Sequence, residues 1–259
     1  MSSTNTPESY IDAQEKLMTL NLLQIAFKKF DTLESFRSYL LTHDVEVSVA
    51  NLSRYINGKA IPKSKLKDSL LEVLVDNKEL GLTIKDLILS HIDININEQG
   101  TISVNNSYLL NDSKNLNAIL FLAIQQNIIP CGITKIITAE VDGIPIATTL
   151  AHLLNIDCVY ARKKKPTGTM NYHSEDILSP NTGRIETLYF PEKFIRSKEQ
   201  VLIIDDIIRS GATQTALVNL VSKCEGIPLK VLILVGIGEH WKKTTKLRFT
   251  EFQALVPLS

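Results

Sequence analysis

From residue 113 onward the sequence alternates helical segments with short apolar strands, and this alternation limits the possible folds more than any other feature of the chain. Three segments carry apolar residues at three- and four-residue spacing and are expected to form helices: 113–126, 144–154 and 213–224. Four runs rich in Val and Ile are expected to form strands: 135–139, 158–162, 200–206 and 230–237. Apolar strands that alternate with helices are typical of a parallel sheet with helices on both faces, so an α/β fold is predicted here.

The chain before this region has a different pattern. Residues 7–76 show helical spacing of apolar residues throughout, with no strand pattern. The segments "IDININ" and "TISVNN" then alternate apolar and polar residues around "EQG", which predicts a hairpin over 92–105 with Gly100 at its turn. At 259 residues the chain is long enough for two domains. We expect an all-helical domain at 1–80 and an α/β domain at 81–259.

The composition is that of a globular protein with no excess of charge. Lysine and arginine together number 28, as do aspartate and glutamate, so any affinity for nucleic acid must come from a local patch. Three widely spaced cysteines, Cys131, Cys158 and Cys224, show no metal-binding spacing and indicate a reducing compartment. The sequence shows neither a secretory leader nor an apolar run of the about 18 residues that a membrane span needs. We expect a cytoplasmic protein that makes no membrane contact.

A pair of short helices is predicted within "TLESFRSYLLTHDVEVSVANLSRYINGKAIPKSK". The first helix should cover about 33–41. Ser48 has a side chain suited to cap the second helix, which should end at Asn57, and Gly58 suits the left-handed residue that follows many helices. Two helices joined by a short turn form a helix-turn-helix pattern.

The second helix of this pair has an apolar and a polar face. Leu52 and Ile56 lie four residues apart and should face the core. This turns four other residues outward: Ala50, Asn51, Ser53 and Arg54. Five basic residues and no acid lie between positions 51 and 67: Arg54, Lys59, Lys63, Lys65 and Lys67. Such a strip attracts phosphates, and Asn and Arg side chains pair well with base edges in the major groove.

Two interpretations of this basic strip are open from the residues themselves. One is a DNA-binding surface whose candidate contacts are Ala50, Asn51, Ser53, Arg54, Lys59 and Lys63. The other is a small helical domain whose lysines are simply solvated. The phrase "LSRYINGKAIPK" resembles the recognition helix and following turn of repressor-type helix-turn-helix proteins, and this favours double-stranded DNA as a partner.

A second informative stretch is "VLIIDDIIRSGATQTA", in which an apolar strand leads into two adjacent acids, Asp205 and Asp206. Adjacent buried carboxylates repel each other and lose hydration, so a ligand is expected to need them. The next residues, Ser210, Gly211, Ala212 and Thr213, should form a helix N-terminus, where free N–H groups favour an anion. Neither the nucleotide-triphosphatase loop nor the three-glycine dinucleotide fingerprint is present. The arrangement suits a ribose 5-phosphate, with its phosphate on the turn and its hydroxyls on the acids.

This stretch is similar to the phosphoribosyl diphosphate (PRPP) binding motif of type I phosphoribosyltransferases. Two more segments resemble the same family in the expected order: "ITAEVDGIPIATTLAHLL" resembles its pyrophosphate loop and following helix, and "VYARKKK" resembles the strand that carries its Arg-Lys pair. The resemblance covers about 94–259. It implies a type I phosphoribosyltransferase-like fold in which Mg²⁺ is held through PRPP and by Asp205 and Asp206. The implied PRPP-binding residues are Asp205, Asp206, Arg209, Ser210, Gly211, Ala212, Thr213, Glu140, Val141, Asp142, Gly143, Arg162 and Lys163.

Several features bear on catalysis without deciding it. The polar stretch at 163–188 is too long for an ordinary connection, and in the family a flexible loop here closes over the substrate; the alternatives are a loose insertion or a β-hairpin. Arg209 stands where the family's enzymes have a small residue or Thr. The base-binding part is expected from the C-terminal segment 236–259, where Trp241 stacks a base or belongs to the core. His173 and His240 are expected at the surface.

The combination of the two parts suggests a specific role. A helix-turn-helix before a PRPP-binding domain resembles the archaeal regulators with an orotate-phosphoribosyltransferase-like domain and, more distantly, the Gram-positive purine repressor. The resemblance implies a homodimeric transcription regulator whose DNA affinity responds to PRPP or a nucleotide. The alternative is an active nucleobase phosphoribosyltransferase, for orotate or a purine, with an accessory DNA-binding domain. If the chain is an enzyme, Asp205 and Asp206 are its candidate catalytic residues.

Overall fold

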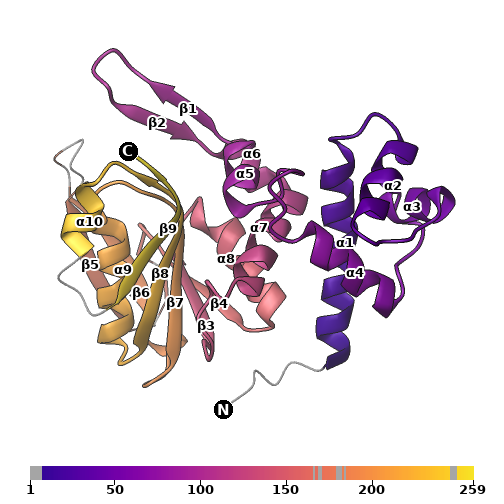
Figure 1. Cartoon of the computed structure of the whole chain (residues 1–259). Helices are drawn as coiled ribbons and strands as arrows, with labels where there is room; N and C mark the ends of the chain where they lie inside the picture. The colour runs from indigo at the N-terminus through magenta and orange to yellow at the C-terminus, as the bar shows by residue number, and fades with distance from the viewer. Residues whose placement is uncertain (1–7, 166, 169–170, 179–182, 184, 246–249) are drawn as a thin grey trace.

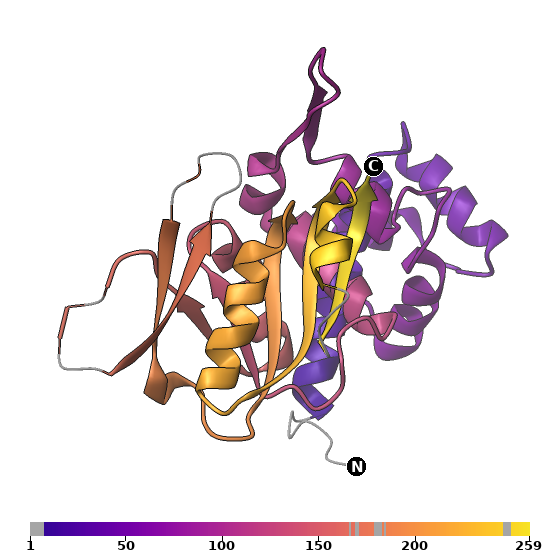
Figure 2. The ribbon, with the colours of Figure 1, turned by 90° about the vertical axis from the view of Figure 1, so that its left-hand side faces the viewer.

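The computed structural model describes residues 8–165, 167–168, 171–178, 183, 185–245 and 250–259, and it begins with five helices (Figure 1). These are α1 (Glu8–Phe27), α2 (Leu33–Thr42), α3 (Val49–Ile56), α4 (Ser64–Leu74) and α5 (Ile84–Leu89). The expected hairpin follows as β1 (Asp93–Ile96) and β2 (Ile102–Asn105), paired antiparallel with Gly100 in its turn at φ +74°. The hairpin projects away from the rest of the molecule in both views (Figures 1 and 2).

A five-stranded parallel sheet forms the centre of the C-terminal part. Its strands, in spatial order, are β4 (Asp157–Ala161), β3 (Lys135–Ala139), β7 (Gln200–Ile208), β8 (Ile227–Ile237) and β9 (Glu251–Leu258). Four further helices accompany it: α6 (Ser107–Asn111), α7 (Ser113–Gln125), α8 (Gly143–Leu154) and α9 (Ala212–Lys223). A short helix, α10 (His240–Thr245), precedes the last strand. The predicted α/β fold with a parallel sheet is therefore confirmed.

The two faces of the sheet are covered by different elements, as the alternation of side chains along a strand requires. In β7, Leu202 and Ile204 belong to a core shared with α7 and α8, whereas Val201 and Ile203 belong to a core shared with α9. All four side chains are fully buried. Figure 2 shows α9 and α10 in front of the sheet and the N-terminal helices behind it.

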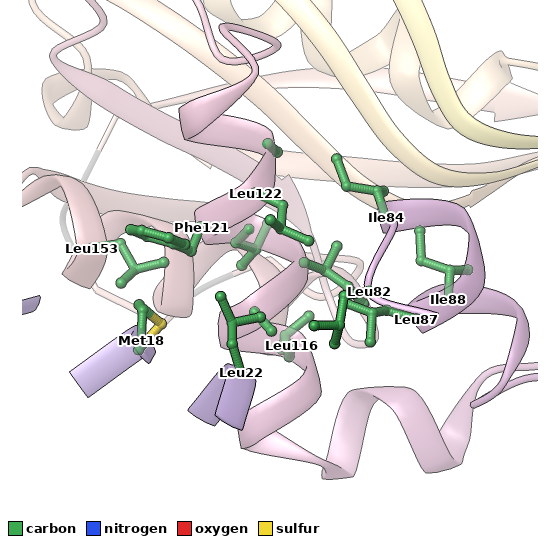
Figure 3. Close-up of a cluster of buried hydrophobic side chains, with 14 of the residues drawn as sticks. Met18, Leu22, Leu82, Ile84, Leu87, Ile88, Leu116, Phe121, Leu122 and Leu153 are labelled. Atoms are coloured by element: carbon green, nitrogen blue, oxygen red, sulfur yellow. The ribbon is translucent and has the colours of Figure 1, made fainter. Parts of the chain in front are cut away.

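Helix α1 connects the N-terminal helices to the α/β part through a common apolar core. Met18 and Leu22 of α1 lie in one cluster with Leu116 and Phe121 of α7 and with Leu153 of α8 (Figure 3). The same helix also contacts α3 and α4. Two polar contacts, from the Tyr10 hydroxyl (2.8 Å) and the Gln14 amide (3.3 Å), reach the carbonyl oxygen of His152 in the last turn of α8. The helical region thus packs directly on the α/β region.

The described part of the polar stretch 163–188 consists largely of a hairpin, which was one of the alternatives for this stretch. Strands β5 (Tyr172–Leu178) and β6 (Ile185–Pro191) pair antiparallel, and β5 packs on α9. A single-turn helix, η1 (Glu192–Phe194), follows. Positions 166, 169–170, 179–182 and 184 lie outside the described residues. Residues 172–178 and 185–188 of this stretch accordingly form strands of a β-hairpin.

All three cysteines are free thiols: Cys131 is exposed, Cys158 is half-buried and Cys224 is buried. Burial raises the pKa of both the Cys158 and the Cys224 thiol to about 11. Within the described part of the chain, no helix combines the length and the apolar character needed to cross a membrane.

Candidate functional site

The candidate site lies at the carboxyl ends of the neighbouring strands β3 and β7. Because these strands are parallel and paired, the segments that leave them emerge at the same edge of the sheet. The segment 140–143 follows β3, and Asp205 and Asp206 lie in the last part of β7, which continues to Ile208. A Cβ placed on Gly143 would lie 2.9 Å from Oδ1 of Asp205. The structure therefore brings together the acid pair and the segment expected to bind pyrophosphate.

Asp205 is the buried member of the acid pair. Only 6% of its surface is exposed, and its Oδ2 accepts a hydrogen bond of 2.7 Å from Nε2 of Gln214. Its Oδ1 accepts a second bond, of 3.1 Å, from the backbone N–H of Asp206. Burial raises the pKa of Asp205 well above its usual range, and the negative charge of Asp206 raises it further. Two charges in this position disfavour each other unless a cation or hydroxyl donors approach them.

Asp206 is half-buried and faces a residue that lies far away in the sequence. Its Oδ2 accepts a hydrogen bond of 2.7 Å from Nδ2 of Asn106, which immediately follows the β1–β2 hairpin. Burial raises the pKa of Asp206, while the Asn106 bond opposes that rise by stabilising the charged form. We did not predict Asn106 as a site residue.

The predicted anion-binding turn has the expected geometry. Gly211 has φ +81°, which a residue with a side chain adopts at a cost, and α9 begins at the next residue, Ala212. The hydroxyl of Ser210 accepts a bond of 3.3 Å from the Ala212 N–H. The N–H groups of the first turn of α9 and the positive end of its dipole are directed to this turn. Thr213 lies half-buried in the same turn.

The segment after β3 is held in place by its first residue. The Glu140 N–H donates to the carbonyl of Ala161 (3.0 Å), and its carboxylate accepts a bond of 2.7 Å from the Lys163 N–H. The peptide between Glu140 and Val141 is cis. Val141 is 72% exposed and Asp142 is also exposed, so this loop presents its backbone to solvent before Gly143 starts α8.

Arg162 and Lys163, two of the three cations predicted for the site, have protein partners in this structure. The Arg162 guanidinium donates from Nη2 to the Tyr160 hydroxyl (2.8 Å) and lies 5.0 Å from the centre of that ring. The Lys163 Nζ lies 2.9 Å from the carboxylate of Glu186 in β6. Both cations are exposed, so these pairs contribute little stability and exchange easily for a ligand. A cavity of about 480 Å³ adjoins Arg162 and is lined in part by Val159, Pro191 and Phe194.

Arg209 contacts the hairpin rather than the turn that follows it. Its Nη1 donates a bond of 2.8 Å to the carbonyl oxygen of Ile102 in β2. The side chain is exposed. The structure therefore assigns Arg209 a contact that its place in the motif did not indicate.

The acid pair fits a magnesium ion that is held jointly with a ligand. Among the residues that the structure describes, no group of three or more His, Cys, Asp and Glu side chains is placed to hold a metal ion by itself. Asp205 and Asp206 supply carboxylate oxygens, which Mg²⁺ prefers, and Mg²⁺ commonly completes its shell with water and substrate phosphate. The side chains present thus suit an ion that arrives with a phosphorylated ligand.

The helical pair predicted for DNA binding is present. The side chain of Ser48 caps α3 by accepting a bond of 3.2 Å from the Asn51 N–H, and Gly58 follows the helix with φ +65°. Leu52 is fully buried. Of the six candidate contacts, five are exposed and Ser53 is half-buried; the exposed ones are Ala50, Asn51, Arg54, Lys59 and Lys63.

One member of the basic strip does not belong to that surface. Lys67 is buried with 5% exposure, and its Nζ contacts Asp12, Glu15 and Asp68. The bond to Glu15 raises the pKa of Lys67. The charge that its position in the sequence added to the strip is therefore compensated by acids of α1. Lys65 is exposed, as expected.

Part of the C-terminal segment that was expected to bind the base belongs to the sheet and its core. Its last residues form β9, an edge strand of the sheet, which we did not predict. Trp241 is buried with 5% exposure and packs over Gly236, so its core alternative is favoured over base stacking. His240 is exposed and His173 is half-buried on β5. Positions 246–249 lie outside the described residues.

Comparison with known sequences relates this chain to purine phosphoribosyltransferases. It is 32% identical over 105 residues to a xanthine phosphoribosyltransferase of Staphylococcus epidermidis, which covers 40% of this chain and 55% of that protein. It is 36% identical over 107 residues to an adenine phosphoribosyltransferase of Brachyspira hyodysenteriae (41% and 61%). It is 30% identical over 129 residues to a xanthine phosphoribosyltransferase of Lactobacillus acidophilus (48% and 67%). The chain thus spans 55–61% of the length of the first two relatives. No family model matches the chain.

Comparison with solved structures gives the same relationship at the level of the fold. The adenine phosphoribosyltransferase of Thermoanaerobacter pseudethanolicus aligns with a TM-score of 0.58 at 20% identity, over 68% of this chain and 100% of that one. The enzyme of Saccharomyces cerevisiae aligns with a TM-score of 0.58 at 18% identity, over 67% and 98%. The α/β part of the chain therefore has the fold of these proteins.

Proposed function

Since the chain belongs to the phosphoribosyltransferase family through its C-terminal part, we propose that it binds PRPP and transfers the ribose 5-phosphate group to a purine base. The observation that supports this most is the acid pair Asp205–Asp206, which lies next to the loop after β3 and a few residues before the N-terminal turn of α9. A ligand with a phosphate, neighbouring hydroxyls and a diphosphate has groups for each of these three features.

The turn at 210–213 holds the 5-phosphate of PRPP in this proposal. Free N–H groups and the helix dipole favour an anion there, and Gly211 lets the backbone approach the phosphate closely. Asp206 and Asp205 accept hydrogen bonds from the ribose hydroxyls or hold a magnesium ion that also binds the diphosphate. When bound, Mg²⁺ neutralises the charge that develops on the leaving pyrophosphate.

The diphosphate lies between the loop after β3 and the start of the polar stretch. The exposed backbone around Val141 and Asp142 offers N–H groups, and Arg162 and Lys163 exchange their present partners for phosphate oxygens. In the reaction the bond from the anomeric carbon to the diphosphate oxygen breaks. A bond from that carbon to a ring nitrogen of the base forms, pyrophosphate leaves with the bonding electron pair, and the N–H proton of the base passes to solvent.

A purine is the base class that the relatives favour. The relatives described above are enzymes for xanthine and adenine. The test is release of pyrophosphate from PRPP and Mg²⁺ with each of adenine, guanine, hypoxanthine, xanthine and orotate. Release with a purine that is lost in Asp205→Asn and Asp206→Asn supports the proposal. PRPP binding with no release for any base removes the transferase activity and leaves a ligand sensor.

A second function, ligand-dependent DNA binding, is favoured by the surface of α3. Asn51 and Arg54 project from a capped helix, and Lys59 and Lys63 lie exposed just after it. In this proposal the chain is a homodimeric regulator whose two α3 helices bind half-sites about one helical turn apart. PRPP or a nucleotide changes the DNA affinity only if it binds two arrangements of the dimer unequally.

The two functions are separated by one pair of measurements. Binding to double-stranded DNA from upstream of the protein's own coding region is measured with and without PRPP, at a stated salt concentration. A shift with PRPP in a protein that releases no pyrophosphate identifies a regulator. Equal DNA affinity with and without PRPP, in a protein that does release pyrophosphate, identifies an enzyme with an accessory helical region.

A further inference from the structure

We propose that Asn106 is a positioning residue of the PRPP site, which holds the Asp206 carboxylate in the orientation that receives the sugar. This inference rests on the proposed binding of PRPP. It extends the site to the residue that directly follows the β1–β2 hairpin, outside all three segments that resemble the family.

The geometry of Asn106 indicates a dedicated contact. Asn106 is the N-cap residue of α6, a position where an Asn side chain ordinarily accepts hydrogen bonds from N–H groups of its own helix. Here the side chain makes no capping bond, and its Nδ2 instead donates 2.7 Å to Oδ2 of Asp206, 100 residues away. The capping task falls to the preceding Asn105, whose Oδ1 accepts from the Ser107 N–H at 3.1 Å.

The surroundings leave Asn106 little freedom. Only 9% of its surface is exposed, so its amide is fixed by packing as well as by the bond. A second contact fixes the hairpin close by, because Arg209 donates to the carbonyl of Ile102 in β2. Asn106, directly after β2, is thus attached to the acid pair, and Ile102, at the start of β2, is attached to the residue before the anion-binding turn.

This arrangement divides the acid pair by partner. Asp205 accepts a side-chain hydrogen bond from Gln214 in α9, and Asp206 accepts one from Asn106, the N-cap residue of α6. An ionised carboxylate can accept about four hydrogen bonds, so Asp206 keeps acceptor sites for ligand hydroxyls while Asn106 occupies one. Without Asn106 the carboxylate loses the side-chain donor that helps to orient it. A preorganised group binds better than a mobile one, so affinity for the sugar should fall.

The test compares ligands that use different parts of the site. Asn106→Leu keeps the size of the side chain and removes the donor. The expected result is a loss of about ten-fold or more in affinity for PRPP with Mg²⁺ and for ribose 5-phosphate, by calorimetry. Inorganic phosphate, which needs only the turn at 210–213, should perturb the amide resonances of that turn at the same concentration in both proteins.

The matched control is Asn111→Leu. Asn111 lies in the same short helix and donates a bond of similar length, 2.8 Å, but to the carbonyl of Ser107. It should leave the affinities for all three ligands unchanged. If Asn106→Leu does not fold, Asn106→Ser, whose shorter side chain ends before Asp206, takes its place.

Three outcomes would contradict the inference or its premise. Unchanged PRPP affinity in Asn106→Leu overturns the positioning role alone. An equal loss for PRPP and inorganic phosphate shows that Asn106 only supports the local fold, and also overturns it. A wild-type chain that binds neither PRPP nor ribose 5-phosphate overturns the proposed function, and the inference with it.

Discussion

Gln214 donates a hydrogen bond of 2.7 Å to Asp205, and this bond joins the first turn of α9 to the acid pair of β7. Both side chains are buried, at 3% and 6% exposure. The turn that is proposed to hold the phosphate and the acids that are proposed to hold the sugar are therefore fixed relative to each other. A substitution of either Gln214 or Asp205 should therefore affect both the turn and the acid pair.

The buried charge of Asp205 should make stability depend on pH. Its raised pKa, caused first by burial and then by Asp206, means that the folded chain binds a proton more readily than the unfolded chain. The contribution is complete below the ordinary Asp pKa of about 3.9 and is lost as the pH rises through the raised value. We predict that the free energy of unfolding of Asp205→Asn increases relative to that of wild type as the pH rises, so that the variant becomes relatively more stable.

This prediction is checked by urea unfolding at several pH values between about 4 and 8. Asp31→Asn, which changes an exposed acid outside the site, is the control. A constant difference between Asp205→Asn and wild type across this range would contradict the assigned burial cost. The same variant should lose PRPP affinity by about ten-fold or more, because a charged acceptor is removed.

Gly143 should not tolerate a side chain. A Cβ there would lie 1.9 Å from Oγ1 of Thr138 and 2.9 Å from Oδ1 of Asp205. Gly143→Ala should therefore lower the free energy of unfolding by about 1–3 kcal/mol and weaken PRPP binding. Adding Thr138→Ala removes the closest atom and should restore part of both losses. A Gly143→Ala protein with wild-type stability and affinity would show that Gly143 does not pack closely against Thr138 and Asp205.

The lysines of the basic strip should divide into two groups. Lys63→Ala removes an exposed charge and should reduce the slope of log affinity against log salt for DNA by about one, with no loss of stability. Lys67→Met removes the cation of Glu15 and one of the two cations of Asp12, which keeps its ion pair with Lys16. It should cost about 1–3 kcal/mol of stability, less than for a fully buried pair, because Asp12 and Glu15 are partly exposed.

Thermal melts and salt titrations of DNA binding check this division, and Arg54→Ala completes it. That variant should weaken DNA binding and leave PRPP affinity intact. Equal salt slopes for Lys63→Ala and wild type would remove Lys63 from the proposed interface. A fully stable Lys67→Met protein would contradict the structural role of the buried lysine.

The shared core should make the helical and α/β regions unfold together. Leu22 in α1 is fully buried against side chains of α7 (Figure 3), so Leu22→Ala should lower the free energy of unfolding by about 2–5 kcal/mol. Trp241, the single tryptophan, is buried on the opposite face of the sheet and reports on the α/β part. Its fluorescence and the helical circular dichroism should shift to the same new midpoint. Two separate transitions would show that the regions fold independently.

The local signals in the sequence predicted much of the fold and part of the site. The strand that contains Asp205, the turn at Gly211 and the cap at Ser48 each depend on residues within a few positions, so their sequence patterns were sufficient. What the patterns could not supply were partners from distant elements. Asn106 meets Asp206 across 100 residues, and Lys67 meets the acids of α1 across more than 50.

The C-terminal strand shows a different limit. The segment of β9 is mostly half-buried and includes Pro257 near its end, so it lacks the continuous apolar character of β7. An edge strand needs only one hydrogen-bonded neighbour and one well-covered face, which weakens the sequence pattern. The polar stretch was ambiguous for a related reason, because β5 largely alternates exposed and half-buried residues and contains few apolar ones.

Helix α1 has a consequence for attempts to recombine this protein. Its apolar side chains serve α3 and α4 on one side and α7 on the other, and Tyr10 and Gln14 bond the end of α8. In a chimera that joins a foreign helical segment after α1, the apolar side chains of α1 would have to fit both the new segment and α7. An exchange of α2–α4 should therefore keep α1 with its host and redesign only the side that faces α3 and α4.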